Sequence, residues 1–144
     1  MSAAKRFLTD AERDAVIAAI QQAERFTSGE IRVHIGNFCL GSEIRMAQKI
    51  FTRLGMHKTR ERNGVLIYIA VMNRKLAVIG DAGIHEKLGS TYWETLVSGL
   101  ITKIKSGKKG EGLAESILDC GRQLSHYFPR QSDDTNELSD TISY

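Results

Sequence analysis

Residues 65–71 (VLIYIAV) are the stretch that most restricts what this chain can fold into. A strand with one exposed face alternates apolar and polar side chains, whereas a strand covered on both faces is apolar throughout. Residues 72–74 (MNR) are short enough for a hairpin turn, and residues 75–80 (KLAVIG) then return as an antiparallel strand. The chain is therefore expected to contain a central strand that is packed between helices.

The segments on either side predict the rest of the architecture. Residues 30–36 (EIRVHIG) alternate strictly, which predicts a strand with one drier face. Helices are expected from a capping box at Thr9 and Glu12 to about Phe26, over 42–54, over 92–106, and, after a break at 107–112, up to Phe128 before Pro129. A crossover through the helix at 42–54 makes the first two strands parallel.

This order predicts an α/β fold, a three-layer α/β/α sandwich around a small mixed sheet of three to four strands. A chain of 144 residues is long enough for one domain with a real core. We expect that domain to occupy residues 1–129, followed by an acidic C-terminal tail at 130–144.

Charged residues are unevenly distributed. The tail (RQSDDTNELSDTISY) carries one basic and four acidic residues, which leaves 19 basic and 13 acidic residues in 1–129. This asymmetry permits an acidic partner, or the chain's own tail, to face the basic body. The excess is too mild for nucleic-acid binding, which needs a denser basic stripe, aromatic platforms or a recognised motif.

Nothing in the sequence indicates export or a membrane partner. Residues 1–14 lack the apolar core of a secretory signal, and no apolar stretch approaches the roughly 20 residues of a membrane span. Cys39 and Cys120 have neither CxxC spacing nor neighbouring metal-type residues. We therefore expect a cytoplasmic protein with two free thiols, and the sequence leaves its oligomeric state open.

The expected topology brings distant polar residues to one edge of the sheet. The first strand begins at Glu30, the second follows Asn63, and the third ends at Asp81. Carboxylate and amide oxygens are the ligands that Ca²⁺ and Mg²⁺ prefer. We therefore predict a shallow divalent-cation site there. An anion or a protein partner would use the neighbouring cations, which are Lys58, Arg60 and Arg62.

Each of these residues also has a simpler interpretation. Strand ends commonly carry Asp, Asn and Gly because these residues make turns. Taken alone, Asp81 is a turn residue between two glycines and Glu30 is a solvated carboxylate at the end of a strand. The convergence of three sequence-distant positions is what supports a site.

Three motifs resemble the TPM domain family, named for its thylakoid phosphatase-like, photosystem II repair and nematode receptor-modulator members. They are residues 28–34 (SGEIRVH), 62–70 (RNGVLIYIA) and 79–84 (IGDAGI), and the similarity extends to 127–129 (YFP). The resemblance implies an α/β/α sandwich. It also implies a groove at the same sheet edge, which binds Ca²⁺ in some members and has been linked to acid phosphatase activity.

The resemblance assigns roles to particular residues. Glu30 matches the acidic end of a TGAE-like motif, Asn63 matches the Asn of a DNGVL motif, and Asp81 lies in the Gly-rich motif after the third strand. Two acidic positions of the family are basic here, because Arg62 replaces the Asp before Asn63 and residues 107–109 (GKK) replace Gly-Asp-Tyr. Both changes weaken Ca²⁺ binding and remove carboxylates that a phosphatase would use. The chain is similar to the soluble, stand-alone bacterial branch, in which this kind of tail recurs.

Three functions follow from the sequence. The leading hypothesis is a protein that binds Ca²⁺ or Mg²⁺ at the sheet edge, and a protein partner, with weak or no catalysis. The first alternative is a metal-dependent phosphomonoesterase in which Glu30 and Asp81 hold the ion while Arg62 or Lys58 orients phosphate. The second is a pure interaction module that uses the basic face or the acidic tail.

Overall fold

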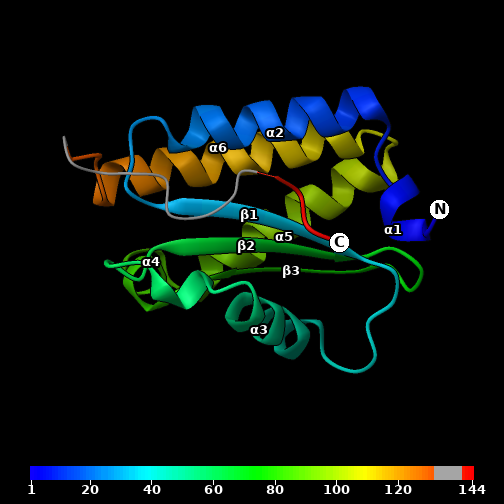
Figure 1. The fold of residues 1–144 in the computed structure, drawn as a ribbon, viewed down its shortest axis with the longest axis horizontal. Helices are drawn as coiled ribbons and strands as arrows, with labels where there is room; N and C mark the ends of the chain where they lie inside the picture. The colour runs from blue at the N-terminus through cyan, green and yellow to red at the C-terminus, as the bar shows by residue number, and fades with distance from the viewer. Residues whose placement is uncertain (132–140) are drawn as a thin grey trace.

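A computed structural model describes residues 1–131 and 141–144. Its sheet has three strands in the order β1 (Glu30–Gly36), β2 (Gly64–Ala70) and β3 (Lys75–Gly80). Strand β1 pairs with β2 in parallel, and β2 pairs with β3 antiparallel (Figure 1). The predicted α/β fold with a small mixed sheet is therefore confirmed.

Helices cover both faces of this sheet. Figure 1 shows α2 (Asp10–Glu24) and α6 (Lys109–Tyr127) above the strands and α3 (Glu43–Arg53) below them. Helix α5 (Ser90–Lys105) packs with α2 and α6 in the larger apolar cluster, and the 3-10 helix Met56–Lys58 joins the smaller cluster with α3. Two short helices, α1 (Ala3–Arg6) and α4 (Ala82–Leu88), complete the described fold.

The apolar run in β2 is buried along its whole length, as predicted. Its side chains divide between the two clusters. Val65, Ile67 and Ile69 face the α2–α5–α6 side, while Leu66, Tyr68 and Ala70 face the α3 side. Burying an apolar side chain of this size is worth about 1.5–3 kcal/mol. The central strand is therefore the element on which both halves of the core depend.

The predicted break at 107–112 is wrong from residue 109 onward. Gly107 has a φ of 78° and ends the turn, but α6 begins at Lys109 and includes Gly110 and Gly112. A Cβ on Gly110 would lie 2.9 Å from Glu12 of α2, and one on Gly112 would lie 2.6 Å from Lys103 of α5. These glycines let three helices approach closely, and a run of glycines in a sequence does not distinguish this role from a turn.

The outer edge of β1 is covered by two distant parts of the chain. The backbone N–H of Ile35 donates to the carbonyl of Ser143 at 2.9 Å, and the N–H of Ser143 donates to the carbonyl of Val33 at 3.0 Å. The carboxylate of Glu24 accepts from the N–H of Ile31 at 2.7 Å. Neighbouring Ile142 is buried in the larger apolar cluster. The acidic residues of the tail, Asp133, Asp134, Glu137 and Asp140, lie outside the described residues.

His34 of β1 predicts how stability depends on pH. Its Nδ1 atom lies 2.7 Å from the hydroxyl of Ser143. Burial, followed by the charges of Arg53 and Arg32, lowers the pKa of His34 to about 4. A histidine in the unfolded chain has a pKa of about 6.5, so the unfolded state takes up this proton first. The free energy of unfolding should therefore fall by about 2–3 kcal/mol from this group as the pH decreases from about 6.5 to about 4.

Urea unfolding of the wild type and of His34→Gln at pH 7 and at about pH 4.5 measures this contribution. The difference between the two proteins isolates His34 from the carboxyl groups that titrate in the same range. If the wild type and the variant lose the same stability between these pH values, the histidine does not carry the effect.

Two other sequence expectations concern the cysteines and the membrane. Cys39 and Cys120 are free and buried, the first in the cluster beside α3 and the second in the α2–α5–α6 cluster. Within residues 1–131 and 141–144, none of the helices is long and apolar enough to cross a bilayer.

Candidate functional site

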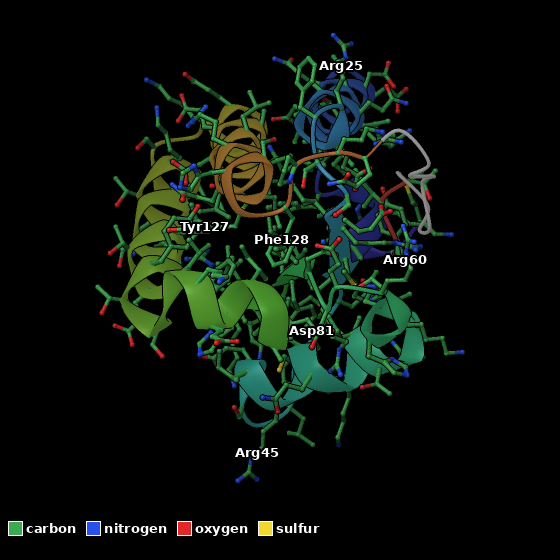
Figure 2. The ribbon with its side chains drawn as sticks, turned by 90° about the vertical axis from the view of Figure 1, so that its left-hand side faces the viewer. Arg25, Arg45, Arg60, Asp81, Tyr127 and Phe128 are labelled. Carbon is green, nitrogen blue, oxygen red and sulfur yellow. The ribbon has the colours of Figure 1, made fainter. Side chains whose placement is uncertain are left out.

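The structure brings Glu30, Asn63 and Asp81 to the same end of the sheet, where β1 and β2 begin and β3 finishes. Glu30 pairs with Gly64 in the parallel register, and its N–H donates to the carbonyl of Asn63 at 3.4 Å. The N–H of Asp81 donates to the carbonyl of Gly64 at 2.9 Å. Three sequence-distant residues therefore surround the first residue of β2, as the topology predicts. Figure 2 looks onto this end of the sheet, with Asp81 labelled.

Asp81 has two roles in this arrangement. It is the N-cap of α4, where its Oδ1 atom accepts from the N–H of Ala82 at 2.8 Å. It also forms a bidentate ion pair with Arg62, with Nε to Oδ2 at 2.6 Å and Nη2 to Oδ1 at 2.8 Å. The Asp81 side chain is 7% exposed, whereas that of Arg62 is 52% exposed. The hydrogen bond and the charge of Asp81 raise the pKa of Arg62.

Arg62 therefore places a guanidinium against the carboxylate that the sequence assigns to a divalent cation. A bidentate arginine–carboxylate pair is well ordered, but an ion pair with one solvated partner contributes only about 0–1 kcal/mol. A divalent cation would have to displace Arg62 before it could bind both oxygens of Asp81. The sequence identified both residues but did not reveal that they pair.

The loop before β2 holds Arg62 in an unusual backbone conformation. Its φ is 52°, in the left-handed region that residues with a side chain seldom occupy. The N–H of Gly83 in α4 donates to the Arg62 carbonyl at 2.8 Å. A Cβ on Gly83 would lie 2.2 Å from the carbonyl oxygen of Glu61 and 2.7 Å from that of Arg62. Helix α4 can rest on this loop only because residue 83 is glycine.

The side-chain amide of Asn63 is buried at this end of the sheet. The residue is 1% exposed, and its Nδ2 atom donates to the hydroxyl of Ser28 at 3.1 Å. Its N–H donates to the Thr59 hydroxyl at 3.3 Å. Among the described residues no hydrogen-bond donor reaches its Oδ1 atom. A buried polar atom without a partner costs about 1–3 kcal/mol, so this oxygen is well suited to a cation or another donor.

Glu30 is also buried, on the strand face that carries Arg32 and His34. Paired residues on neighbouring strands point to the same face, so Glu30 shares its face with the position of Gly64. A Cβ on Gly64 would lie 3.3 Å from the backbone carbonyl of Met56. The Met56 carbonyl therefore lies on the side of β2 to which Glu30 points. Within the described residues no group of three or more His, Cys, Asp or Glu side chains is placed to hold a metal.

The predicted anion-binding cations differ in their contacts and their positions in the fold. Arg62 contacts Asp81, Lys58 ends the 3-10 helix with an exposed side chain, and Arg60 is exposed between them. Figure 2 places Arg60 well apart from Asp81. The three basic residues therefore face different surroundings although they are close in sequence.

A hollow of about 550 Å³ opens beside the Arg62–Asp81 pair. It lies between α3, the end of β3 and the start of α5, and two histidines, His57 and His85, line it. The Nε1–H of Trp93 donates to Nδ1 of His85 at 2.9 Å. Because an indole N–H can only donate, the Nδ1 atom of His85 is the acceptor, and its neutral ring carries the proton on Nε2. The sequence alone did not indicate this His–Trp contact, since eight residues and a helix boundary separate the two.

Comparison with known proteins identifies similar folds and a family. The chain is similar over 99% of its length to the BA42 protein from the psychrophilic bacterium Bizionia argentinensis. The two are 38% identical, with a TM-score of 0.87 and 99% of the BA42 chain covered. It also resembles the N-terminal domain of a P. gingivalis protein at 17% identity and a TM-score of 0.70, covering 88% of this chain and 84% of that one; at this identity the likeness concerns the fold alone.

No functionally curated protein shows significant similarity to the chain. Residues 2–123 match the TPM domain, a range that contains the sheet, the ion pair and the hollow. With the family motifs placed at the start of β1, at the start of β2 and at the end of β3, the chain belongs to the TPM domain family.

Proposed function

We propose that this TPM domain binds a divalent cation, Ca²⁺ or Mg²⁺, at the sheet edge where β1 and β2 begin. Glu30 and Asn63 are the primary ligands, and Asp81 joins them when Arg62 is displaced. The observation that carries the proposal is the buried Asn63 Oδ1 atom, which has no donor among the described residues. Both ions take oxygen ligands, and Ca²⁺ in particular uses amide carbonyls together with carboxylates.

The same geometry implies weak binding. Of the two acidic ligands, Asp81 is already held by Arg62 and by its role as the N-cap of α4. Sites with few charged ligands bind Ca²⁺ weakly, with dissociation constants of about 10⁻⁴ to 10⁻³ M. Arg62 acts as a built-in competitor, because its guanidinium neutralises Asp81. The domain would therefore respond to high ion concentrations.

An NMR titration with Ca²⁺ and then with Mg²⁺ tests the proposal. We expect backbone amide shifts confined to residues 29–31, 62–64 and 80–86, with half-saturation at about 10⁻⁴ to 10⁻³ M Ca²⁺. Glu30→Gln keeps the shape of the side chain and removes its charge, so it should weaken binding by about 10-fold or more.

Glu115→Gln is the matched control. Glu115 is an exposed carboxylate of α6 that lies 3.7 Å from Lys103, and its loss changes the net charge by the same amount. This variant should titrate like the wild type. Shifts spread over all acidic surface residues, or equal loss of binding in both variants, would show nonspecific screening in place of a site.

The hollow supports a second candidate, hydrolysis of a small phosphomonoester. Arg62, His57 and His85 line it beside Asp81, and such groups can orient phosphate and transfer protons. The assay is p-nitrophenyl phosphate turnover with and without added ion, repeated with Asp81→Asn. Ion-dependent turnover that disappears in this variant supports an enzyme, whereas no turnover in any condition restricts the domain to binding.

A further inference from the structure

The two outer edges of the sheet, at β1 and at β3, differ in what covers them. The carboxylate of Glu24 and the backbone of Ser143 cover the edge of β1. Strand β3 is the outermost strand at the other edge (Figure 1). An uncovered edge strand presents backbone N–H and C=O groups that can pair with another extended chain. Whether β3 can do so depends on which of its backbone groups point outward and on what lies beside them.

The register identifies these outward groups. Gly64 directs its carbonyl to the N–H of Asp81. The backbone N–H and C=O groups of the even-numbered residues of β2 therefore point toward β3, and those of the odd-numbered residues of β3 point toward β2. The hydrogen bond from the Glu30 N–H to the Asn63 carbonyl is consistent with this pattern, because it shows that the backbone carbonyl of an odd-numbered residue before β2 points toward β1. Leu76, Val78 and Gly80 consequently direct their N–H and C=O groups away from the sheet. Within the described residues these groups have no hydrogen-bond partner beyond the sheet.

The hollow of about 550 Å³ lies along this same edge. Val78, Ile79 and Gly80 form one side of it, with α3 and α5 on the flanks. Val78 is only 3% exposed, so its outward backbone groups are recessed and not open to the surrounding solvent. Buried backbone groups are almost always paired in folded proteins. A recessed slot with unpaired backbone groups along its floor is the form of a site for an added strand.

We infer that the outer edge of β3 is a docking site for an extended peptide segment, which adds to the sheet as a fourth strand between α3 and α5. The occupant is a peptide and not the β3 edge of a second copy. In a second copy β3 is recessed between its own α3 and α5, so those helices would meet before the two strands could pair.

The walls of the slot define the side chains that it takes. Ile44 and Phe51 of α3 line one wall, and Ile44 is 45% exposed. Trp93 and the exposed carboxylate of Glu94 line the α5 wall. Side chains of an added strand alternate between the two walls. The partner is therefore a segment with β-branched apolar residues on one side and at least one lysine or arginine on the other.

The test uses the full chain and the designed peptide Thr-Val-Lys-Val-Thr-Val-Lys. At millimolar peptide we expect amide hydrogen exchange at Val78 and Gly80 to slow by about 10-fold or more, because their N–H groups become bonded. The Trp93 indole resonance should shift at the same peptide concentrations. Unchanged exchange at Val78 and Gly80 with this peptide would overturn the inference.

Two N-methylated forms of the peptide separate strand pairing from hydrophobic adhesion. Alternate residues of a strand face the same neighbour, so methylation of one alternate set blocks pairing with β3 and methylation of the other set leaves it intact. One methylated peptide should therefore lose binding while the other keeps it. Equal binding of both would contradict strand addition.

A charge exchange tests the α5 wall. Glu94→Lys should weaken binding of the lysine peptide by about two- to five-fold, as expected for a solvated ion pair. The same variant should bind more tightly a peptide in which glutamates replace the lysines. If Glu94→Lys binds both peptides like the wild type, the basic specificity is wrong.

The peptide site and the proposed ion site can be tested separately, although Asp81 belongs to both. Glu30 and Asn63 do not line the slot, so Glu30→Gln should keep peptide binding, and the titration should give the same result with the ion chelated. Failure of the ion titration would leave this inference unaffected, and the reverse also holds.

Discussion

Arg62→Asp is expected to tighten Ca²⁺ binding by about 100-fold, because the substitution changes two unit charges beside the ion. It removes the guanidinium that occupies both oxygens of Asp81 and adds a carboxylate at the same position. Each unit charge at about 5 Å from a divalent ion is worth on the order of 1–2 kcal/mol even in a solvated site. The backbone favours the change, since Asp tolerates the left-handed conformation of residue 62 better than Arg does.

The measurement is an isothermal or NMR titration at about physiological salt, where charges beyond about 8 Å are screened. Arg60→Asp is the matched control, with the same charge change two residues away and well apart from Asp81 in Figure 2. It should alter Ca²⁺ affinity by less than about three-fold. Equal gains in both variants would mean that general charge, and not release of Asp81, controls binding.

The second large effect concerns Gly83, in the first turn of α4. Gly83→Ala should lower the free energy of unfolding by about 3 kcal/mol, because it combines overpacking against backbone with the loss of a hydrogen bond. The added Cβ would lie 2.2 Å from the Glu61 carbonyl oxygen, and neither backbone segment can move as a side chain does. Separating α4 from the loop would also lengthen the bond from Gly83 to Arg62 and displace Asp81.

Gly99→Ala is the control for this substitution. Gly99 is exposed within α5, and nothing lies within 4 Å of its Cβ position. The same chemical change should there raise the free energy of unfolding by about 0.5–1 kcal/mol through helix propensity. Urea unfolding of both variants measures the contrast. If Gly83→Ala lowers the free energy of unfolding only slightly and keeps Ca²⁺ binding, the close contact between α4 and the loop is not required.

Much of the fold is predictable because it depends on local patterns. The apolar run of β2, the alternation of β1 and the capping box at Thr9 each determine an element from neighbouring residues alone. Helix α4 could not be predicted in this way, because its seven residues have no clear apolar period. It also follows an Asp in a glycine-containing stretch, which indicates a turn equally well. The start of α6 was missed because close helix packing and chain reversal both use glycine.

The candidate site also has one part that the sequence predicts and one part that it does not. The strand directions alone place Glu30, Asn63 and Asp81 at one end of the sheet, because a parallel pair begins at the same end and an antiparallel third strand finishes there. The ion pair between Arg62 and Asp81 could not be predicted, since it needs the left-handed backbone at residue 62 to turn the side chain toward α4.

The sequence by itself determined the strands of the sheet, their relative directions and the end at which polar residues lie, because hydrophobic periodicity and chain connectivity can be read from neighbouring residues. Only the tertiary structure decided which charges neutralise each other and which sheet edge is covered. Those outcomes depend on contacts such as Ser143 with β1 and Arg62 with Asp81, in which one partner is placed by a helix, a loop or a tail that packs from elsewhere in the chain.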